Sequence, residues 1–143
     1  MKEKTVIAFG SFDVLHPGHL HYLRSASTYG RLIVVVARDD SILKAKGRRP
    51  LIDQKSRLEL ISSVRFVWRA VLGNRIEKKD DRYKVLLRFK PDYIALGYDQ
   101  KADMERLKNF IVENGLRSRI IRIGAYKSRT FKSMKLKKLM GTY

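Results

Sequence analysis

The alternation of short apolar runs with stretches of helical spacing is the feature that most constrains the fold of this chain. Runs rich in β-branched residues predict strands at residues 5–10, 32–37, 66–73, 93–97 and 119–124. Between them, apolar residues recur at helical spacing, which predicts helices at about 17–29 and around 58–64, 85–89, 107–111 and 136–140. Strands that alternate with helices favour a parallel sheet with right-handed crossovers. We therefore expect a single α/β domain over residues 1–143, a Rossmann-like, doubly wound parallel sheet of five strands.

The composition excludes several classes of protein. The chain has no cysteine, which rules out disulfides, thiolate metal sites and a cysteine nucleophile. The longest wholly apolar run, Leu32–Ala37, is far shorter than the roughly 20 residues that span a membrane. The N-terminal lysines precede only a short apolar stretch, so we expect no targeting segment and a cytoplasmic protein. The single tryptophan, Trp68, is expected in the core.

The positive charge is the unusual part of the composition. The chain has 32 Lys and Arg against 14 Asp and Glu, a formal net charge of +18, and such a surplus attracts phosphate. Three interpretations are open: a solvated basic surface, a polyanion partner, and cations that hold the phosphates of a nucleotide. Nucleic-acid binding would predict a basic stripe with interleaved aromatics. Because the basic residues are spread along the whole chain, we do not expect a nucleic-acid partner.

The first predicted strand–turn–helix junction carries the most unusual chemistry. Ligands of open α/β sheets bind beyond the carboxyl ends of the strands, and the segment Gly10–His19 (GSFDVLHPGH) lies at such an end. Gly10 leaves the backbone open to close approach by a ligand, and Pro17 suits the first turn of a helix. The free N–H groups of that helix N-terminus form a seat for phosphate, which Gly18 would let a ligand approach.

Two of the three histidines of the chain lie in this turn, three positions apart. The rings of His16 and His19 could point at one bound group, and three interpretations of the pair are open: phosphate contacts, a zinc site, and satisfied structural groups. A zinc ion takes about four ligands, and without cysteine only carboxylates and His21 could complete the set. Phosphate contacts are therefore the favoured hypothesis.

The segment GSFDVLHPGH resembles the signature of the nucleotidyltransferase superfamily that carries an H-x-G-H motif. The match to G-x-F-D-x-x-H-x-G-H is complete, and it falls between the first predicted strand and the first predicted helix. The resemblance implies that a phosphate on an acceptor attacks the α-phosphorus of a nucleoside triphosphate and that pyrophosphate leaves. It also implies catalytic roles for His16 and His19, which would donate hydrogen bonds to the phosphates as charge develops.

The same resemblance implies roles for residues further along the chain. Lys46, in a basic and flexible-looking loop, would close over the phosphates, and Arg57 would contact the reacting groups. Asp13 would bind a ribose hydroxyl or a divalent cation, with Mg²⁺ the expected ion because it pairs with phosphates. Asp53 is predicted only to cap a helix. The expected nucleotide-binding set is Gly10, Ser11, Phe12, Asp13, His16, Gly18, His19, Gly97, Tyr98, Asp99, Tyr126, Arg129, Thr130 and Ser133.

Within this superfamily the chain most resembles the archaeal-type FAD synthases, which join the AMP of ATP to FMN. The resemblance lies in residues 34–64, in LGYDQ at 96–100 and in the block at 124–127. The C-terminal block of cytidylyltransferases is roughly R-T-x-G-I-S-T-T, whereas this chain has R-T-F-K-S-M-K-L. We therefore expect ATP and FMN as substrates and, from the resemblance, a homodimer. The alternatives are cytidylyl transfer to glycerol 3-phosphate, adenylyl transfer to a sugar phosphate, and an RNA-binding or assembly module on a transferase fold.

Overall fold

A computed structural model of the chain describes residues 3–98, 100 and 103–126. Its strands form one parallel sheet in the order β3-β2-β1-β4-β5, which confirms the predicted five-stranded topology. The strand bounds are β1 Thr5–Gly10, β2 Arg31–Val36, β3 Val67–Leu72, β4 Tyr93–Gly97 and β5 Arg119–Ile123. Each lies within one residue of the predicted run, because short segments rich in β-branched residues favour strands.

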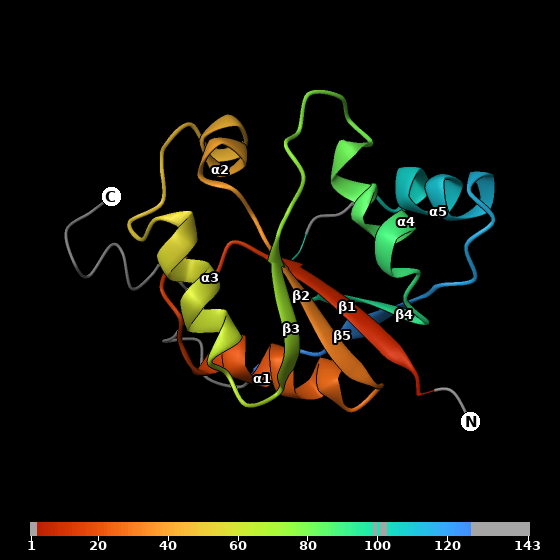
Figure 1. Ribbon diagram of the computed structural model, residues 1–143, viewed down its shortest axis with the longest axis horizontal. Helices are drawn as coiled ribbons and strands as arrows, with labels where there is room; N and C mark the ends of the chain where they lie inside the picture. Colours follow the sequence, from red (N-terminus) through yellow and green to blue (C-terminus); the bar gives the residue numbers. More distant parts are fainter. Residues whose placement is uncertain (1–2, 99, 101–102, 127–143) are drawn as a thin grey trace.

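Helices cover both faces of the sheet (Figure 1). On one face lie α1 (Pro17–Ser27) and α3 (Gln54–Ser62), and on the other lie α4 (Val85–Phe89) and α5 (Met104–Glu113). Alternate residues of the central strands face the two layers: Val6 and Ala8 pack with the α1 side, while Ile7 packs with the α4 and α5 side. The doubly wound arrangement is therefore confirmed. Because all strands are parallel, their carboxyl ends lie together at one edge of the sheet.

The neighbouring strands β1 and β4 stop pairing before they reach that carboxyl edge. β1 pairs with β2 along its whole length, from Thr5↔Arg31 to Gly10↔Val36. Its pairing with β4 covers only the stretch from Val6↔Tyr93 to Ala8↔Ala95. The strand order reverses between β1 and β4, so the opening lies where open α/β sheets bind their ligands.

Two short helices were not predicted from the sequence. The helix α2 (Asp39–Lys46) occupies the segment that we expected to be a flexible loop, and a 3₁₀ turn, η1, covers Asp81–Tyr83. The signals for α2 were present: two aspartates in its first turn, lysines in its last turn, and Gly47 directly after it with a φ of 76°. The predicted helix at 136–140 lies outside the described residues.

Trp68 corrects another expectation, because it is 52% exposed rather than buried in the core. It lies on β3, an edge strand of the sheet, and the guanidinium of Arg31 lies 5.1 Å from the centre of its ring. Burial on both faces is a property of the central strands, and β3 shares it only in part.

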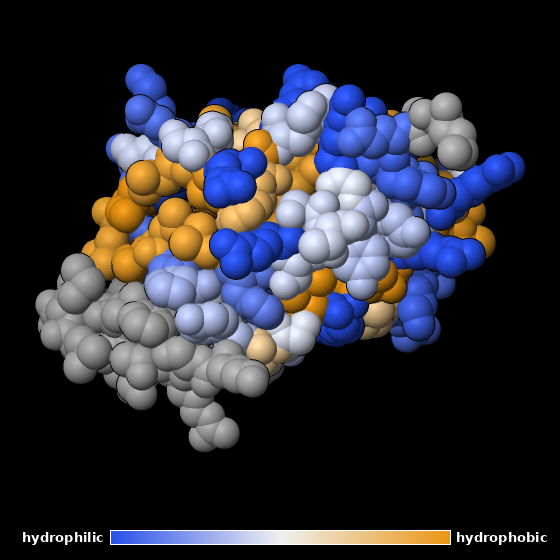
Figure 2. Space-filling view, turned by 90° about the horizontal axis from the view of Figure 1, so that it is seen from below, coloured by the Kyte–Doolittle hydropathy of each residue, from blue (hydrophilic) through white to orange (hydrophobic). Residues whose placement is uncertain are grey.

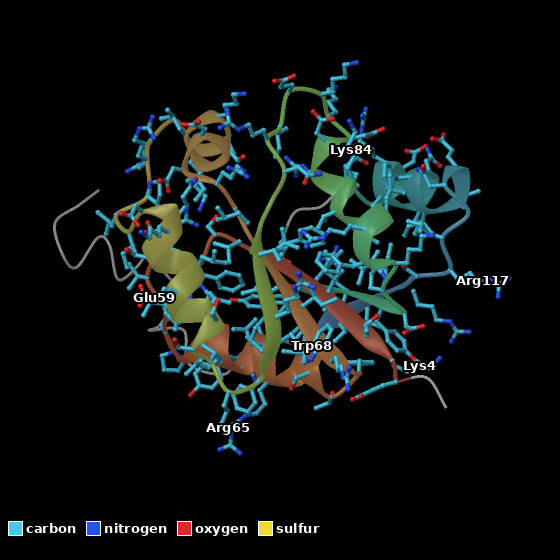
Figure 3. The ribbon with its side chains drawn as sticks, in the orientation of Figure 1. Lys4, Glu59, Arg65, Trp68, Lys84 and Arg117 are labelled. Carbon is cyan, nitrogen blue, oxygen red and sulfur yellow. The ribbon has the colours of Figure 1, made fainter. Side chains whose placement is uncertain are left out.

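The charged side chains are distributed around the molecule. Lys4, Arg65, Lys84 and Arg117 project from different sides of it (Figure 3). The face shown in Figure 2 carries strongly hydrophilic side chains across its width, interrupted by hydrophobic areas. Among the described residues, no helix is long and apolar enough to cross a membrane.

Candidate active site

The two predicted catalytic histidines form the N-terminal cap of α1. His16 is the N-cap residue, and its Nδ1 accepts a hydrogen bond of 3.1 Å from the backbone N–H of Gly18. The Nδ1 of His19 accepts one of 3.3 Å from the backbone N–H of His16, so the two side chains close a reciprocal capping box. The rings stack with their centres 3.8 Å apart. The structure thus brings together the pair that the spacing predicted.

This cap determines which ring nitrogen of each histidine carries a proton. A nitrogen that accepts a hydrogen bond from an N–H group is unprotonated, so Nδ1 of both His16 and His19 bears a lone pair. In the neutral ring the proton then lies on Nε2. Each histidine therefore keeps a fixed N–H donor at the mouth of α1, beside the partial positive charge of the helix N-terminus.

The ring of Phe12 packs against His19 and also leaves no room for a side chain at position 10. The Phe12 side chain is only 4% exposed, and its ring meets that of His19 edge-on at 5.4 Å. A Cβ atom on Gly10 would lie 2.6 Å from the Phe12 ring. We expected Gly10 to leave room for a ligand; instead, the Phe12 side chain fills that space. Phe12 itself has a φ of 51°, an unfavourable conformation that its packing must offset.

Asp13 connects the first turn to the segment before α3. Its carboxylate accepts hydrogen bonds from the backbone N–H groups of Leu51 and Ile52, at 3.0 and 2.9 Å. The residue is only 3% exposed. Both oxygens thus hold the backbone that precedes α3, and the contact of Asp13 with a ribose hydroxyl or a divalent cation stays a prediction. Among the described residues, no three His, Asp or Glu side chains gather as a metal site.

Arg57 is the centre of a buried hydrogen-bond network. Its side chain is fully buried and donates from Nε to the Ile52 carbonyl at 2.8 Å and from Nη1 to the Ser11 carbonyl at 2.7 Å. Its Nη2 forms an ion pair of 2.7 Å with the carboxylate of Asp39. We expected Arg57 to contact the reacting groups, but the structure turns its guanidinium onto the protein. These contacts join the first turn to the start of α2, and a contact of Arg57 with the reacting groups stays a prediction.

Asp39 and Gln54 belong to the same network, and the sequence analysis gave neither a role. The Oε1 of Gln54 accepts a 2.9 Å hydrogen bond from the backbone N–H of Asp39, which lies at the start of α2. Acidic residues are favoured in the first turn of any helix, because they interact with the helix dipole. The position of Asp39 therefore gave no separate signal for its ion pair with Arg57. Asp53 caps α3 as predicted, and the hydrogen bond from Ser56 lowers the pKa of its carboxyl group.

Lys46 is the last residue of α2 and is exposed. The helix lies above the carboxyl edge of the sheet, next to the segment that follows β3 (Figure 1). Two basic side chains join α2 to the segment that follows β3. Lys44 Nζ donates to the Ile76 carbonyl at 3.0 Å, and Arg38 Nε donates to the Gly73 carbonyl at 2.7 Å. Lys46 thus lies at the end of a helix, and side-chain hydrogen bonds attach this helix to the segment after β3. We expected it in a flexible loop instead.

The other predicted nucleotide contacts lie around the ends of β4 and β5. Gly97 is buried at the end of β4, while the Tyr98 side chain is 46% exposed. Tyr126 is exposed, and its ring lies 5.6 Å from that of His21 on α1. The remaining predictions fall outside the described residues: Asp99, Arg129, Thr130 and Ser133.

A parallel doubly wound sheet with paired histidine donors at its first helix N-terminus defines a class of phosphate-handling enzymes, and the comparisons identify the class. A family model described as cytidylyltransferase-like matches residues 7–138. The chain therefore belongs to the cytidylyltransferase-like family, and it is a nucleotidyltransferase. This confirms the resemblance that the H-x-G-H segment indicated.

Curated relatives are similar over almost the whole chain. A protein named FAD synthase from Thermoplasma acidophilum is 43% identical over 136 residues, which cover 94% of this chain and 93% of that protein. Another FAD synthase, from Methanothermobacter marburgensis, is 40% identical over 128 residues, or 87% of this chain and 76% of that protein.

Solved structures support the same fold. A Thermoplasma volcanium structure described as a lipopolysaccharide core biosynthesis protein is 43% identical, with a TM-score of 0.78, and the match covers 88% of this chain and 100% of that one. A pantoate–β-alanine ligase from Francisella tularensis is 14% identical with a TM-score of 0.60, covering 90% of this chain and 61% of that one. The second likeness shows the fold alone.

Proposed function

We propose that this chain is an FAD synthase, which transfers AMP from ATP to FMN and releases pyrophosphate. The observation that carries the proposal is the similarity to FAD synthases over more than nine-tenths of the chain. It is supported by the histidine cap, which is intact at the place where a nucleotidyltransferase needs phosphate donors. The sequence resemblance to the archaeal-type enzymes leads to the same reaction.

The reaction requires the site to bring two anions together. An oxygen of the FMN phosphate attacks the α-phosphorus of ATP and forms a new P–O bond. The bond from that phosphorus to the oxygen it shares with the β-phosphate breaks, and the electron pair leaves with pyrophosphate. Little covalent help is needed from the protein, so catalysis rests on positioning and on neutralising charge.

His16 and His19 supply fixed donors for this step. Their Nδ1 atoms accept from backbone N–H groups, so each ring would donate to a phosphate oxygen through its Nε2–H. Donors that are already oriented stabilise charge in the transition state without further reorganisation. The N-terminus of α1, where the backbone N–H groups of its first turn lie, adds to the same positive field.

Lys46 and Arg57 have different roles in this proposal. Lys46, exposed at the end of α2, neutralises phosphate charge from above the edge of the sheet. Arg57 is a positioning residue that holds the Ser11 carbonyl and Asp39. The nucleotide contacts proposed are Gly97, Tyr98, Asp99, Tyr126, Arg129, Thr130 and Ser133, with the backbone of the first turn.

Mg²⁺ enters this proposal with the nucleotide. The ion usually keeps several waters and binds substrate phosphates through few protein carboxylates. Since both oxygens of Asp13 are hydrogen-bonded to the backbone, the triphosphate oxygens are the ligands that we propose for it. When bound, the ion reduces the repulsion between the two anionic substrates.

We further propose a cytoplasmic homodimer. The edge strand β3 and its surroundings expose large apolar side chains, with Trp68 52% and Leu60 43% exposed. Burying such a surface against a second copy would stabilise both chains. The cytoplasm follows from the proposed substrates, because ATP and FMN are metabolites of the cell interior. Light scattering coupled to size-exclusion chromatography tests the dimer, and a monomer at micromolar concentration would contradict it.

The second candidate is transfer of a nucleotidyl group to a sugar phosphate. It is favoured by the likeness to the Thermoplasma volcanium structure, which is described as a lipopolysaccharide core biosynthesis protein. The fold and the histidine cap would serve either acceptor, because both carry an attacking phosphate.

A product assay distinguishes the candidates. The purified chain is incubated with Mg²⁺ and, separately, ATP with FMN, CTP with glycerol 3-phosphate, and ATP with a heptose phosphate. We expect FAD and pyrophosphate from the first pair alone. A nucleotide sugar from the third pair without FAD would establish the second candidate, and CDP-glycerol from the second pair alone would establish cytidylyl transfer.

Histidine variants test the mechanism in the same assay. His16→Ala and His19→Ala should each lower kcat by about 10²–10³-fold, the usual loss when one transition-state donor is removed. Arg24→Ala, an exposed position in the last turn of the same helix, is the matched control and should retain activity. Near-normal kcat in either histidine variant would contradict the proposed role of the cap.

A further inference from the structure

The opening between β1 and β4 is bridged by a side chain. Backbone pairing of the two strands ends at Ala8↔Ala95, whereas β4 continues beside β5 as far as Gly97↔Ile123. Beyond the last pair, the Phe9 carbonyl and the Gly97 N–H belong to strands that no longer bond to each other. Buried backbone groups of this kind need partners.

Gln100 supplies both partners with one amide. Its Nε2 donates to the Phe9 carbonyl at 2.6 Å, and its Oε1 accepts from the Gly97 N–H at 2.8 Å. A primary amide carries one donor side and one acceptor, so it can stand where a strand's peptide group would stand. The side chain thus holds the ends of β1 and β4 at a fixed separation without closing the opening.

The bridge is itself anchored on two sides. Tyr22, which is buried on α1, lies with its hydroxyl 2.8 Å from the Ala95 carbonyl and 3.4 Å from Gln100 Oε1. From β5, Arg122 Nη1 donates to the Gly97 carbonyl at 3.1 Å and to the Gln100 carbonyl at 3.0 Å. The amide therefore connects the end of β4 with the helix that carries the histidine cap.

From this network we infer that Gln100 is a positioning residue that sets the width of the nucleotide cleft between the first turn and the end of β4. The inference rests on the proposed function, since it concerns the cleft that would receive ATP. Gln100 touches the ends of the strands rather than the reacting phosphates. Its loss therefore weakens nucleotide binding more than it slows the chemical step.

The same two strands have a second side-chain bridge, which provides a matched control. At their amino ends, the carboxylate of Asp92 accepts a 2.9 Å hydrogen bond from the backbone N–H of Thr5. A merely structural role for Gln100 predicts that losing either bridge has the same effect. A positioning role predicts that only the bridge at the carboxyl end affects ATP.

The experiment compares Gln100→Ala and Asp92→Ala in the full chain. The dissociation constant of ATP is measured by isothermal titration calorimetry without FMN, and kcat and KM are measured in the FAD assay. For Gln100→Ala we expect a dissociation constant and KM for ATP raised about tenfold, which corresponds to about 1.4 kcal/mol, with kcat within about threefold. For Asp92→Ala we expect an unchanged dissociation constant despite a lower melting temperature.

An isosteric variant keeps the test decisive if alanine unfolds the chain. Gln100→Glu retains the shape but sets an acceptor oxygen against the Phe9 carbonyl, so it should weaken ATP binding at least as much. Unchanged ATP binding in the folded variant, or equal losses in the Gln100 and Asp92 variants, would overturn the inference. A wild-type chain that binds ATP but makes no FAD would contradict only the proposed function, whereas no ATP binding would overturn both.

Discussion

Replacing Arg57 by methionine tests whether this side chain holds the site together or acts on the substrate. The guanidinium is fully buried, and its loss leaves the carboxylate of Asp39 without its ion-pair partner at 2.7 Å. Breaking a buried ion pair costs about 3–5 kcal/mol. Because Asp39 is 22% exposed and water can reach it, we take about 2 kcal/mol for the pair. The carbonyls of Ser11 and Ile52 each lose a donor, at about 1 kcal/mol apiece.

The expected total is a loss of about 4 kcal/mol, a large part of the roughly 5–15 kcal/mol that stabilises a domain. With a urea dependence of about 2 kcal/mol per molar, the unfolding midpoint should fall by about 2 M. Far-UV circular dichroism during a urea titration measures this midpoint. Lys55→Met removes the same charge from an exposed position of the same helix and should leave the midpoint almost unchanged.

The alternative role gives a different result. If Arg57 contacted the reacting phosphates, Arg57→Met would lose kcat and keep a wild-type urea midpoint. That combination would refute the reasoning from the buried network.

Other positions give independent tests. Gly10→Ala would set a Cβ atom 2.6 Å from the Phe12 ring, and we expect a loss of about 1–3 kcal/mol together with lower activity, measured by urea unfolding and the FAD assay. Gly30→Ala would set a Cβ atom against the Lys4 carbonyl at a φ of 155°, and it should lower stability without a specific effect on KM. The backbone hydrogen bonds to Asp81 hold the pKa of its carboxyl group well below the ordinary value of 3.8, so its stabilising contribution is complete above about pH 4 and is lost as the pH falls further. Asp81→Asn should therefore flatten the decline in melting temperature below pH 4, and an unchanged acid profile would contradict this assignment.

Much of the fold could be predicted because its signals are local. Runs such as Leu32–Ala37 allow little but a buried strand, and the spacing of apolar residues between such runs indicated four of the helices. The short helix α2 escaped because Ile42 is its one buried residue and its apolar residues form no recurring pattern, although its charges and Gly47 mark both ends. The cap of α1 was also local, since His16 is hydrogen-bonded to Gly18 and to His19 within one turn.

The sequence by itself thus determined the strand–helix alternation, the H-x-G-H turn and, through resemblance, the class of reaction. Only the tertiary structure decided what Asp13, Arg57, Trp68 and Gln100 contact. Asp13 meets backbone groups 38 and 39 residues away, and the Gln100 amide reaches a carbonyl 91 residues away. Such partners are chosen by how the layers pack and where the strands end. A side chain's type and its near neighbours say what it can bond to, whereas packing decides what lies within its reach.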